Sequence, residues 1–285
     1  MGGQGTKREL RKQRAPALSS RSKRSAPPPH ATSAPAPKRQ QVVAAAGDQE
    51  TAQLEEEYNL LTSEAGTAGA EEDSEKRPGA KITIVLDMAC LESVKSKSGK
   101  FELLNCDDHL SLHARLGRDP KDSRPDICHQ MMLTILDSPL NKAGLVSLFV
   151  RSAKGTLIQI SPELRMPRTF KRFAGLMVQL LREMKIRAET GGKTLMKTVK
   201  NPVEIHLPTN ARRFATSVKG TLVDVYELVD TFKEGQPLVF RFGAMARGKI
   251  DEGEDELLSF STYPLSGSYA VGRLLGAFEK KWGIV

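Results

Sequence analysis

Two short loops combine glycine, hydroxyl and aromatic residues in a pattern suited to holding a small molecule. Gly243–Lys249 (GAMARGK) follows the apolar run Leu238–Phe240, and Ser261–Ser266 (STYPLS) follows the apolar run Leu257–Phe260. Such runs predict short buried strands, and open α/β sheets bind ligands at the carboxyl ends of their strands. Glycines allow close backbone approach, and Pro264 stiffens the second loop. Together the two loops predict a small-molecule pocket.

Three arginines form a second group of residues that could bind a ligand. Arg165, Arg168 and Arg172 are spaced three and four apart, at the N-terminal end of a helix that we expect to begin around Pro167. Cations are more stable at helix C-termini, where the macrodipole favours them. Their position therefore indicates an anionic partner such as a phosphate backbone. Pairing with acidic neighbours, or simple solvation, is the alternative.

An acid–base pair adjoins the next predicted helix. Asp126 lies two residues after Arg124 and just before the apolar stretch Ile127–Leu136. An aspartate at this place can cap the helix, orient the arginine through charge-assisted hydrogen bonds, or act in catalysis. The residues alone leave these roles open.

Other motifs exclude several classes of enzyme. GAMARGK matches most of a P-loop, but Ile250 replaces the hydroxyl that would bind magnesium, and too few residues follow to complete such a domain. His109 and His113 lie four apart without a third ligand, which favours a surface or core role over zinc, so no metal is expected. The absence of a GxSxG elbow leaves a nucleophilic hydrolase without support.

The elements that would position these residues alternate between strands and helices, which predicts an α/β domain. The expected strands are Ile82–Asp87, Leu145–Val150 and Thr156–Ile160, the last two forming a hairpin, and Ala215–Leu222 is weakly strand-like. Leu195–Val199 and Val203–Leu207 are short apolar stretches around Asn201-Pro202. The expected helices are Phe101–Leu116, Ile127–Leu136, the segment from Pro167, Val223–Val229 and Tyr269–Trp282. The core face of the helix from Pro167 is predicted to carry Phe170, Phe173, Met177, Leu180, Leu181 and Met184.

Charge and cysteine content indicate the kind of partner and the cellular compartment to expect. Residues 1–77 carry 12 Lys/Arg against 11 Asp/Glu, while the remainder carries 31 against 23, a net charge of +8 out of +9 for the 285 residues. A basic folded part is expected of a protein that meets nucleic acid, although a basic charge can also serve solubility alone. Three cysteines without a CxxC motif indicate a reducing compartment. We expect no membrane span and no signal peptide.

The first 77 residues read as a tail. Basic clusters separated by Ala, Pro and Ser precede an acidic stretch from Asp48 to Glu75, and such composition cannot bury enough apolar surface to fold. We therefore expect a disordered, low-complexity segment at 1–77 and a folded domain at 78–285. The basic clusters suit nuclear import or loose RNA contact, and a merely solvated tail is the alternative.

Several motifs together resemble one known family. The stretches that carry the resemblance are RPDICHQ (Arg124–Gln130), DSPLNKAG (Asp137–Gly144), RMPRTFKRFAGLMVQLL (Arg165–Leu181), KNP (Lys200–Pro202), GAMARGK and STYPLS. They resemble the SPOUT-class methyltransferases that methylate N1 of a pseudouridine in small-subunit ribosomal RNA, the ribosome-biogenesis factors of the essential-for-mitotic-growth type. The resemblance spans 81–285 and leaves out the tail.

The resemblance implies an α/β trefoil-knot fold with a largely parallel sheet flanked by helices. Composition and periodicity give no sign of a knot, which general topology rules disfavour. It further implies a homodimer that uses S-adenosyl-L-methionine and works with pre-ribosomal assembly factors in the nucleus and nucleolus. The expected substrate is a pseudouridine-containing loop of small-subunit rRNA with its base splayed out.

The resemblance also assigns roles to residues. The implied cofactor pocket comprises Thr216, Gly243, Gly248, Phe260, Ser261, Thr262, Tyr263, Pro264 and Leu265. RNA contacts are implied for Arg124, Arg165, Arg168 and Arg172, with Asp126 orienting Arg124 or, as a weaker hypothesis, acting as general base. A second function class stays open, namely an rRNA-binding assembly scaffold that keeps the pocket without catalysis.

Overall fold

The computed structural model of the chain describes residues 82–96, 98–189, 192–250 and 255–285. The predicted tail at 1–77 and the predicted domain start at residue 78 lie outside the described residues. Within the part that is described, no helix is long and apolar enough to cross a membrane.

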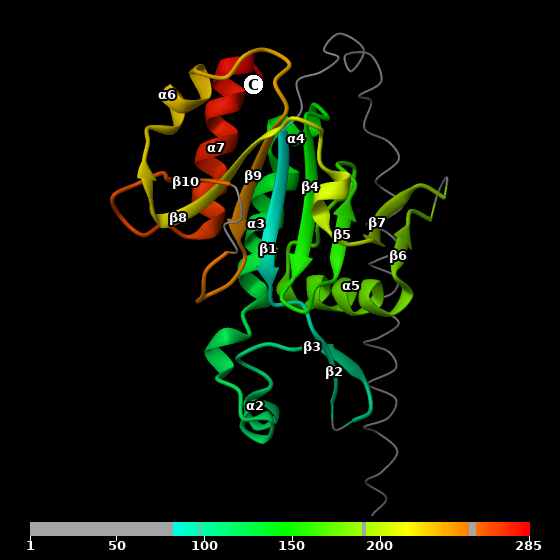
Figure 1. Cartoon of the computed structure of the whole chain (residues 1–285). Helices are drawn as coiled ribbons and strands as arrows, with labels where there is room; N and C mark the ends of the chain where they lie inside the picture. The colour runs from blue at the N-terminus through cyan, green and yellow to red at the C-terminus, as the bar shows by residue number, and fades with distance from the viewer. Residues whose placement is uncertain (1–81, 97, 190–191, 251–254) are drawn as a thin grey trace, which may run out of the picture. The chain divides into compact units, whose positions relative to one another are not determined.

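Eight strands form one mixed sheet in the order β10-β8-β9-β1-β4-β5-β7-β6 (Figure 1). Its strands are β1 (Ile82–Ala89), β4 (Val146–Ser152), β5 (Leu157–Ile160), β6 (Lys185–Arg187), β7 (Thr194–Val199), β8 (Arg212–Leu222), β9 (Leu238–Gly243) and β10 (Glu256–Ser259). The four pairings from β10 to β4 are parallel, and the three from β4 to β6 are antiparallel. The prediction of a largely parallel sheet is confirmed. The implied knot stays a prediction.

β1 lies in the middle of the sheet because both of its faces are apolar. Ile82, Ile84 and Leu86 point into the larger core, whereas Val85 points into a smaller cluster on the opposite face. All are at most 1% exposed. This burial explains the near-continuous apolar run, since a strand covered on both sides has no solvent face to alternate with.

Helices cover the larger core, and a 3₁₀ turn, η4 (Val203–His206), packs Val203 onto the opposite face. The helices are α2 (Leu110–Leu116), α3 (Pro125–Asp137), α4 (Pro139–Lys142), α5 (Phe170–Glu183), α6 (Val225–Asp230) and α7 (Gly267–Trp282). α7, predicted over Tyr269–Trp282, buries Val271, Leu274, Leu275 and Phe278 at helical spacing. α3, predicted over Ile127–Leu136, spans Pro125–Asp137. Phe173, Met177 and Leu180 of α5 are buried too.

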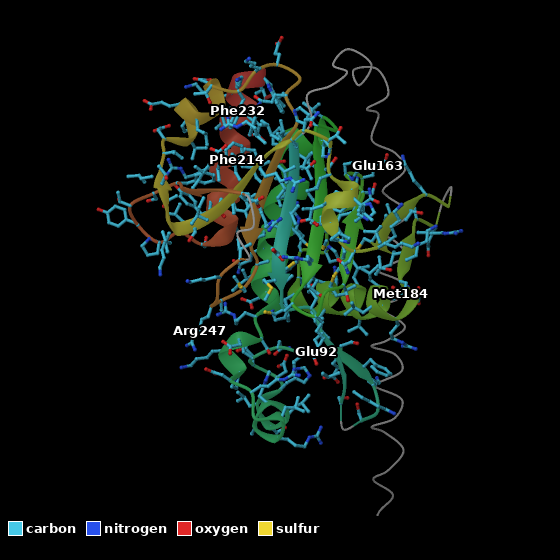
Figure 2. The ribbon with its side chains drawn as sticks, viewed as in Figure 1. Glu92, Glu163, Met184, Phe214, Phe232 and Arg247 are labelled. Atoms are coloured by element: carbon cyan, nitrogen blue, oxygen red, sulfur yellow. The ribbon has the colours of Figure 1, made fainter. Side chains whose placement is uncertain are left out.

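The core face predicted for α5 is wrong at its last member. Met184 adopts a left-handed conformation as the C-cap of the helix and is 54% exposed (Figure 2). The start predicted at Pro167 is also wrong, because the helix begins at Phe170 after an extended Thr169.

The helix predicted over Phe101–Leu116 is wrong for its first half. Residues Phe101–Leu103 form β3, which pairs antiparallel with β2 (Ser93–Lys95). The Asn105 side-chain oxygen then accepts the backbone N–H groups of Asp107 and Asp108, at 2.9 and 2.8 Å. This asparagine turn competes with helical hydrogen bonding, so only α2 remains helical. Another 3₁₀ turn, η3 (Pro120–Asp122), follows before α3.

Aromatic packing stabilises the edge of the sheet nearest the C-terminus. Phe214 of β8 stacks on Phe240 of β9 with ring centroids 5.1 Å apart, and Phe232 lies 5.5 Å from Phe214 (Figure 2). Phe278 of α7 joins the cluster from the helix layer. Aromatic pairs at these separations add stability beyond their buried area, so this cluster stabilises the part of the sheet from which the glycine loop extends.

Candidate functional site

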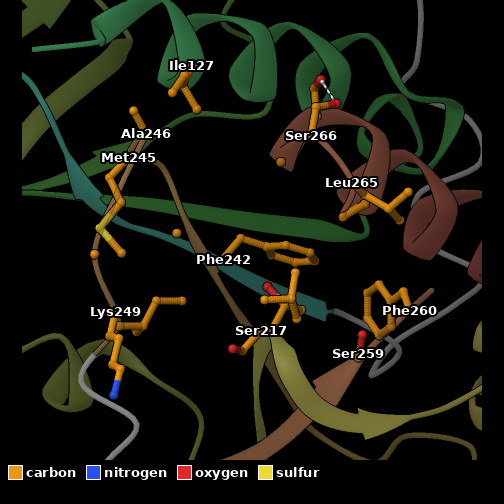
Figure 3. Close-up of a pocket in the computed structure, with 18 of the residues that line it drawn as sticks. Ile127, Ser217, Phe242, Met245, Ala246, Lys249, Ser259, Phe260, Leu265 and Ser266 are labelled. Carbon is orange, nitrogen blue, oxygen red and sulfur yellow. Dashed lines mark hydrogen bonds between the residues drawn. The ribbon is translucent and has the colours of Figure 1, made fainter. Parts of the chain in front are cut away.

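A cavity of about 500 Å³ lies where β9 and β10 end, and we call it the strand-end pocket (Figure 3). Its size is typical of small-molecule sites. Residues that line it come from the loops after both strands, from β8 and from the first turns of α3 and α7. Phe242, Phe260 and Leu265 lie together on one side, and Met245 lies across from them. The structure thus places a cavity between the two loops that the sequence singled out.

A bulge in β8 brings three further residues to the pocket. In the parallel pairing with β10 the partner of Leu257 is Ala215, but the partner of the next residue, Leu258, is Thr221. Residues 216–220 are therefore bulged out of this pairing, and Thr216, Ser217 and Val218 line the cavity. Bulges next to functional sites commonly redirect side chains in this way.

Gly220 closes that bulge against the neighbouring strand. A Cβ built on Gly220 would lie 2.5 Å from the backbone carbonyl carbon of Leu258, closer than any side chain tolerates. Glycine permits such an approach because it has no side chain. The bulge therefore depends on glycine at this position.

The glycine loop begins at the end of β9 and is held from β1. The Ala244 N–H donates to the Asp87 carbonyl at 2.7 Å, and Gly243 and Gly248 both line the pocket. Gly248 has φ +124°, a conformation open chiefly to glycine. The backbone of this loop can therefore lie close to a bound molecule.

The second loop contributes some, but not all, of its predicted residues. Phe260, Ser261, Tyr263 and Leu265 line the pocket, whereas Thr262 and Pro264 are exposed and do not. The Ser261 hydroxyl accepts the Tyr263 N–H at 3.0 Å, which turns the chain. Ser266 then caps α7 by accepting the Tyr269 N–H at 3.3 Å.

Arg124 lines the pocket from the start of α3. Its Nε and Nη2 donate to the two carboxylate oxygens of Asp126 at 2.8 and 2.6 Å. This bidentate pair lowers the pKa of Asp126 and raises the pKa of Arg124. Capping by Asp126 is wrong, since Arg124 is the N-cap and Asp126 stands in the first turn. Of the roles left open by the sequence, orienting the arginine is the one that this geometry fits.

The arginine segment, Arg165–Arg172, lies mostly before α5 rather than on it. None of its three arginines lines the strand-end pocket. Arg168 is 79% exposed and pairs with Asp137, the last residue of α3, at 2.9 Å. The common helical face predicted for these arginines is therefore wrong, since Arg165 and Arg168 precede the helix.

One buried histidine joins the arginine segment to α3. His129 hydrogen-bonds through Nε2 to the Pro167 carbonyl at 2.7 Å and stacks on Phe173 with ring centroids 4.4 Å apart. Burial lowers its pKa, so the neutral ring is favoured. Because α3 also carries Arg124, this histidine connects the segment to the pocket.

The two histidines considered for zinc are core residues. His113 is fully buried and His109 is 7% exposed. His109 lies 3.1 Å from a Glu102 carboxylate oxygen, and His113 lies 3.2 Å from the Asn105 carbonyl. Across the described residues, no group of three or more His, Cys, Asp or Glu side chains could hold a metal.

Sequence reasoning missed several residues of the pocket. Ser217 and Val218 depend on the bulge, while Ile127 and Gln130 come from α3. Arg247 also lines the pocket, and its side chain pairs with Asp119 at 3.2 Å, which ties the glycine loop to the segment before Arg124 (Figure 2). The one available signal was the near-P-loop itself, whose Arg247 and Lys249 add charge beside the cavity.

Comparison with known proteins connects this geometry to a family. The model of the EMG1/NEP1 methyltransferase family matches residues 84–279. A curated relative from Candida albicans, "Ribosomal RNA small subunit methyltransferase NEP1", is 46% identical over 212 residues, covering 72% of this chain and 79% of the relative. The chain belongs to the EMG1/NEP1 methyltransferase family.

Other EMG1/NEP1 proteins give the same result. The human protein of the same name is 45% identical over 210 residues, covering 73% of this chain and 84% of that protein. A crystal structure of Archaeoglobus fulgidus Nep1 bound to S-adenosylhomocysteine matches with a TM-score of 0.53 and 24% identity, covering 72% of this chain and 99% of the archaeal one. At that identity the structural match supports the fold.

Proposed function

We propose that this protein methylates N1 of a pseudouridine in small-subunit ribosomal RNA, using S-adenosyl-L-methionine, during ribosome biogenesis. Its EMG1/NEP1 relatives are named small-subunit rRNA methyltransferases. The observation that carries the proposal is the strand-end pocket, where the glycine loop, the Ser261–Leu265 loop and the Arg124–Asp126 pair meet.

The pocket fits a nucleoside cofactor by size and by chemistry. Phe242, Phe260 and Leu265 supply apolar contacts for an adenine ring, while the loop at Gly248 lets backbone groups approach a ligand closely. When bound, S-adenosyl-L-methionine supplies the methyl group. The backbone of both loops then serves to hold and orient it, since an in-line transfer depends on positioning.

Arg124 is the residue that we assign to the target base. A fixed guanidinium beside the pocket can stabilise the anion that forms when pseudouridine N1 loses its proton to water. Asp126 holds that guanidinium through two hydrogen bonds. Because this pairing lowers the pKa of Asp126, the carboxylate is a poor base at neutral pH, and we assign it to orientation.

The test is transfer of labelled methyl to an rRNA hairpin that contains pseudouridine, against the same hairpin with uridine. We expect methylation of the first hairpin alone. Methylation of neither, despite tight binding of both, would favour the assembly scaffold over the enzyme.

We further propose a homodimer. Val218, Tyr263 and Tyr269 are between 60% and 75% exposed on elements that form the pocket, and we take them as candidate contacts between the two copies. Light scattering of the wild type and of Tyr269→Lys checks this, with a monomeric wild type contradicting it.

The domain division and the localisation are proposals as well. We expect a variant lacking residues 1–77 to keep methyl transfer, because the pocket lies within the remaining chain. A fluorescent fusion of the full chain should collect in the nucleus and nucleolus, with assembly factors of the small subunit. The same fusion without 1–77 tests whether the basic clusters of the tail direct it there.

A further inference from the structure

Two oppositely charged side chains, Arg241 and Asp255, are buried together outside the pocket. Arg241 of β9 is 7% exposed. Its Nε lies 3.3 Å from Asp255, whose side chain is 4% exposed, and its Nη2 lies 3.5 Å from Glu204 of η4. Burying charge is costly unless it is paired, and removing one member of a buried pair is more costly than removing an exposed one.

The buried pair joins the two strands that carry the pocket loops. Arg241 lies two residues before Gly243, at the end of β9. Asp255 directly precedes β10. The pair therefore connects the strand before the glycine loop to the strand before the Ser261–Leu265 loop.

Arg241 also contacts the bulge of β8 through its backbone. Its carbonyl accepts the Thr216 hydroxyl at 3.3 Å, and Thr216 lines the pocket. One residue thus links three parts of the cavity wall: the bulge, the glycine loop and the start of β10.

A neighbouring pair supports the same wall from β1. Arg151 of β4 donates from Nε and Nη2 to the two carboxylate oxygens of Asp87, at 2.6 and 2.5 Å. The Asp87 backbone carbonyl holds Ala244, the second residue of the glycine loop. The Arg241–Asp255 and Arg151–Asp87 pairs therefore both involve a residue next to the start of the glycine loop, Arg241 on β9 and Asp87 on the adjacent β1.

We propose that the Arg241–Asp255 pair positions the cofactor side of the strand-end pocket, so that it sets cofactor affinity without touching cofactor or RNA. The inference rests on the proposed function. Neither residue lines the cavity, so Arg241 and Asp255 are positioning residues. Glu204 contributes less, because it is 39% exposed and its distance from Arg241 is longer.

The chain offers a matched control at the next residue. Glu256 pairs with Arg212 at 2.8 Å, but the two side chains are 55% and 41% exposed. Exposed pairs contribute little, whereas removing one carboxylate from a buried charge pair is costly. Asp255→Asn and Glu256→Gln make the same chemical change, from carboxylate to amide, in the two environments.

The experiment measures binding of S-adenosylhomocysteine by calorimetry, the KM for S-adenosyl-L-methionine, kcat, and hairpin affinity. Asp255→Asn should raise the cofactor KM and the product Kd about tenfold, as misplaced binding groups do. It should leave hairpin affinity unchanged. Glu256→Gln should stay within about twofold of wild type in all four measurements.

Cofactor binding that Asp255→Asn leaves unchanged, or weakens no more than Glu256→Gln does, would overturn the inference. So would equal losses of cofactor and hairpin affinity, which indicate general damage. A wild-type protein that binds no S-adenosylhomocysteine would contradict the proposed function instead. Should Asp255→Asn not fold, Arg241→Lys is the second test, because lysine keeps the charge but lacks the Nε that contacts Asp255. The cofactor KM should rise about threefold, and an unchanged KM would overturn the proposal.

Discussion

The strand-end pocket and the arginine segment, Arg165–Arg172, are assembled by different means. The pocket wall is mainly backbone: a bulge closed by Gly220, a loop with Gly248 at positive φ, and buried charge pairs behind them. The arginine segment is largely side chain, with Arg165 and Arg168 exposed. It is attached through the His129 hydrogen bond to Pro167 and the Arg168–Asp137 pair.

This difference separates the consequences of mutation. A change that displaces the backbone of the pocket wall alters the fold and cofactor binding together, because backbone cannot move without moving its neighbours. A change in the arginine segment alters charge on the surface and leaves the core in place. Substitutions at Gly220, Arg124, Arg168 and His129 test that separation.

Gly220→Ala should destabilise the protein most, by about 3 kcal/mol, because the new Cβ would collide with the Leu258 backbone. Urea unfolding measures the loss. The control is Gly276→Ala in α7, where a Cβ would meet nothing within 4 Å. This variant should be more stable than wild type by about 0.5–1 kcal/mol. If Gly220→Ala is as stable as wild type, the backbone at Leu258 can shift to accept the new Cβ, and the pocket wall is not fixed by its backbone.

Arg124→Lys should lower kcat/KM about a hundredfold while protein stability and cofactor affinity change little. Lysine keeps the charge but cannot make the bidentate contact to Asp126. Steady-state methylation and product binding separate these effects. As a control, Arg118→Lys alters a pair with Glu92 that lies outside the pocket and should keep full activity. Equal activity of both variants would remove Arg124 from the site.

Arg168→Ala should weaken hairpin binding about threefold and reduce its salt dependence, with cofactor affinity intact. Asp137→Asn is the matched control, since it removes the carboxylate that pairs with Arg168 and leaves the arginine. That variant should bind the hairpin at least as well as wild type. An unchanged salt slope for Arg168→Ala would refute the phosphate contact.

The smallest expected effect is on the pH dependence of stability and concerns His129, which connects α3 to the arginine segment. Burial lowers its pKa in the folded state, so the unfolded chain takes up a proton first as the pH falls below about 6.5. Its stabilising contribution is therefore present above that pH and is lost as the pH falls through the folded pKa. Unfolding free energies at pH 7.5 and 5.5 should differ less for His129→Gln than for wild type. An equal difference would contradict this assignment.

Local patterns predicted the elements whose burial is continuous or periodic. β1, β9 and β10 are short apolar runs, and α7 has its buried face at helical spacing, so each carries its own signal. Residue spacing alone predicted a small-molecule pocket at the two loops, and the family resemblance added the identity of the cofactor.

Features that depend on distant partners were not predictable in this way. The bulge of β8 exists because β10 pairs with β8 on both sides of residues 216–220. The sequence of β8 alone does not predict this pairing. The helix expected from Phe101 fails because Phe101–Leu103 pairs with β2 instead. The shared face of the arginines fails for a local reason, since the helix begins at Phe170, three residues after Pro167.

The place of β1 in the sheet has a consequence for synthesis of the chain. β1 is made early, yet its parallel partner β9 follows roughly 150 residues later, on the order of ten seconds at typical rates of translation. During that interval β4 can pair with one edge of β1, while the other stays open and apolar, a known route to aggregation. β10 and α7 come last. The free edge of β1 therefore stays uncovered until β9 is made, and the pocket forms only after β10 and the start of α7 have followed.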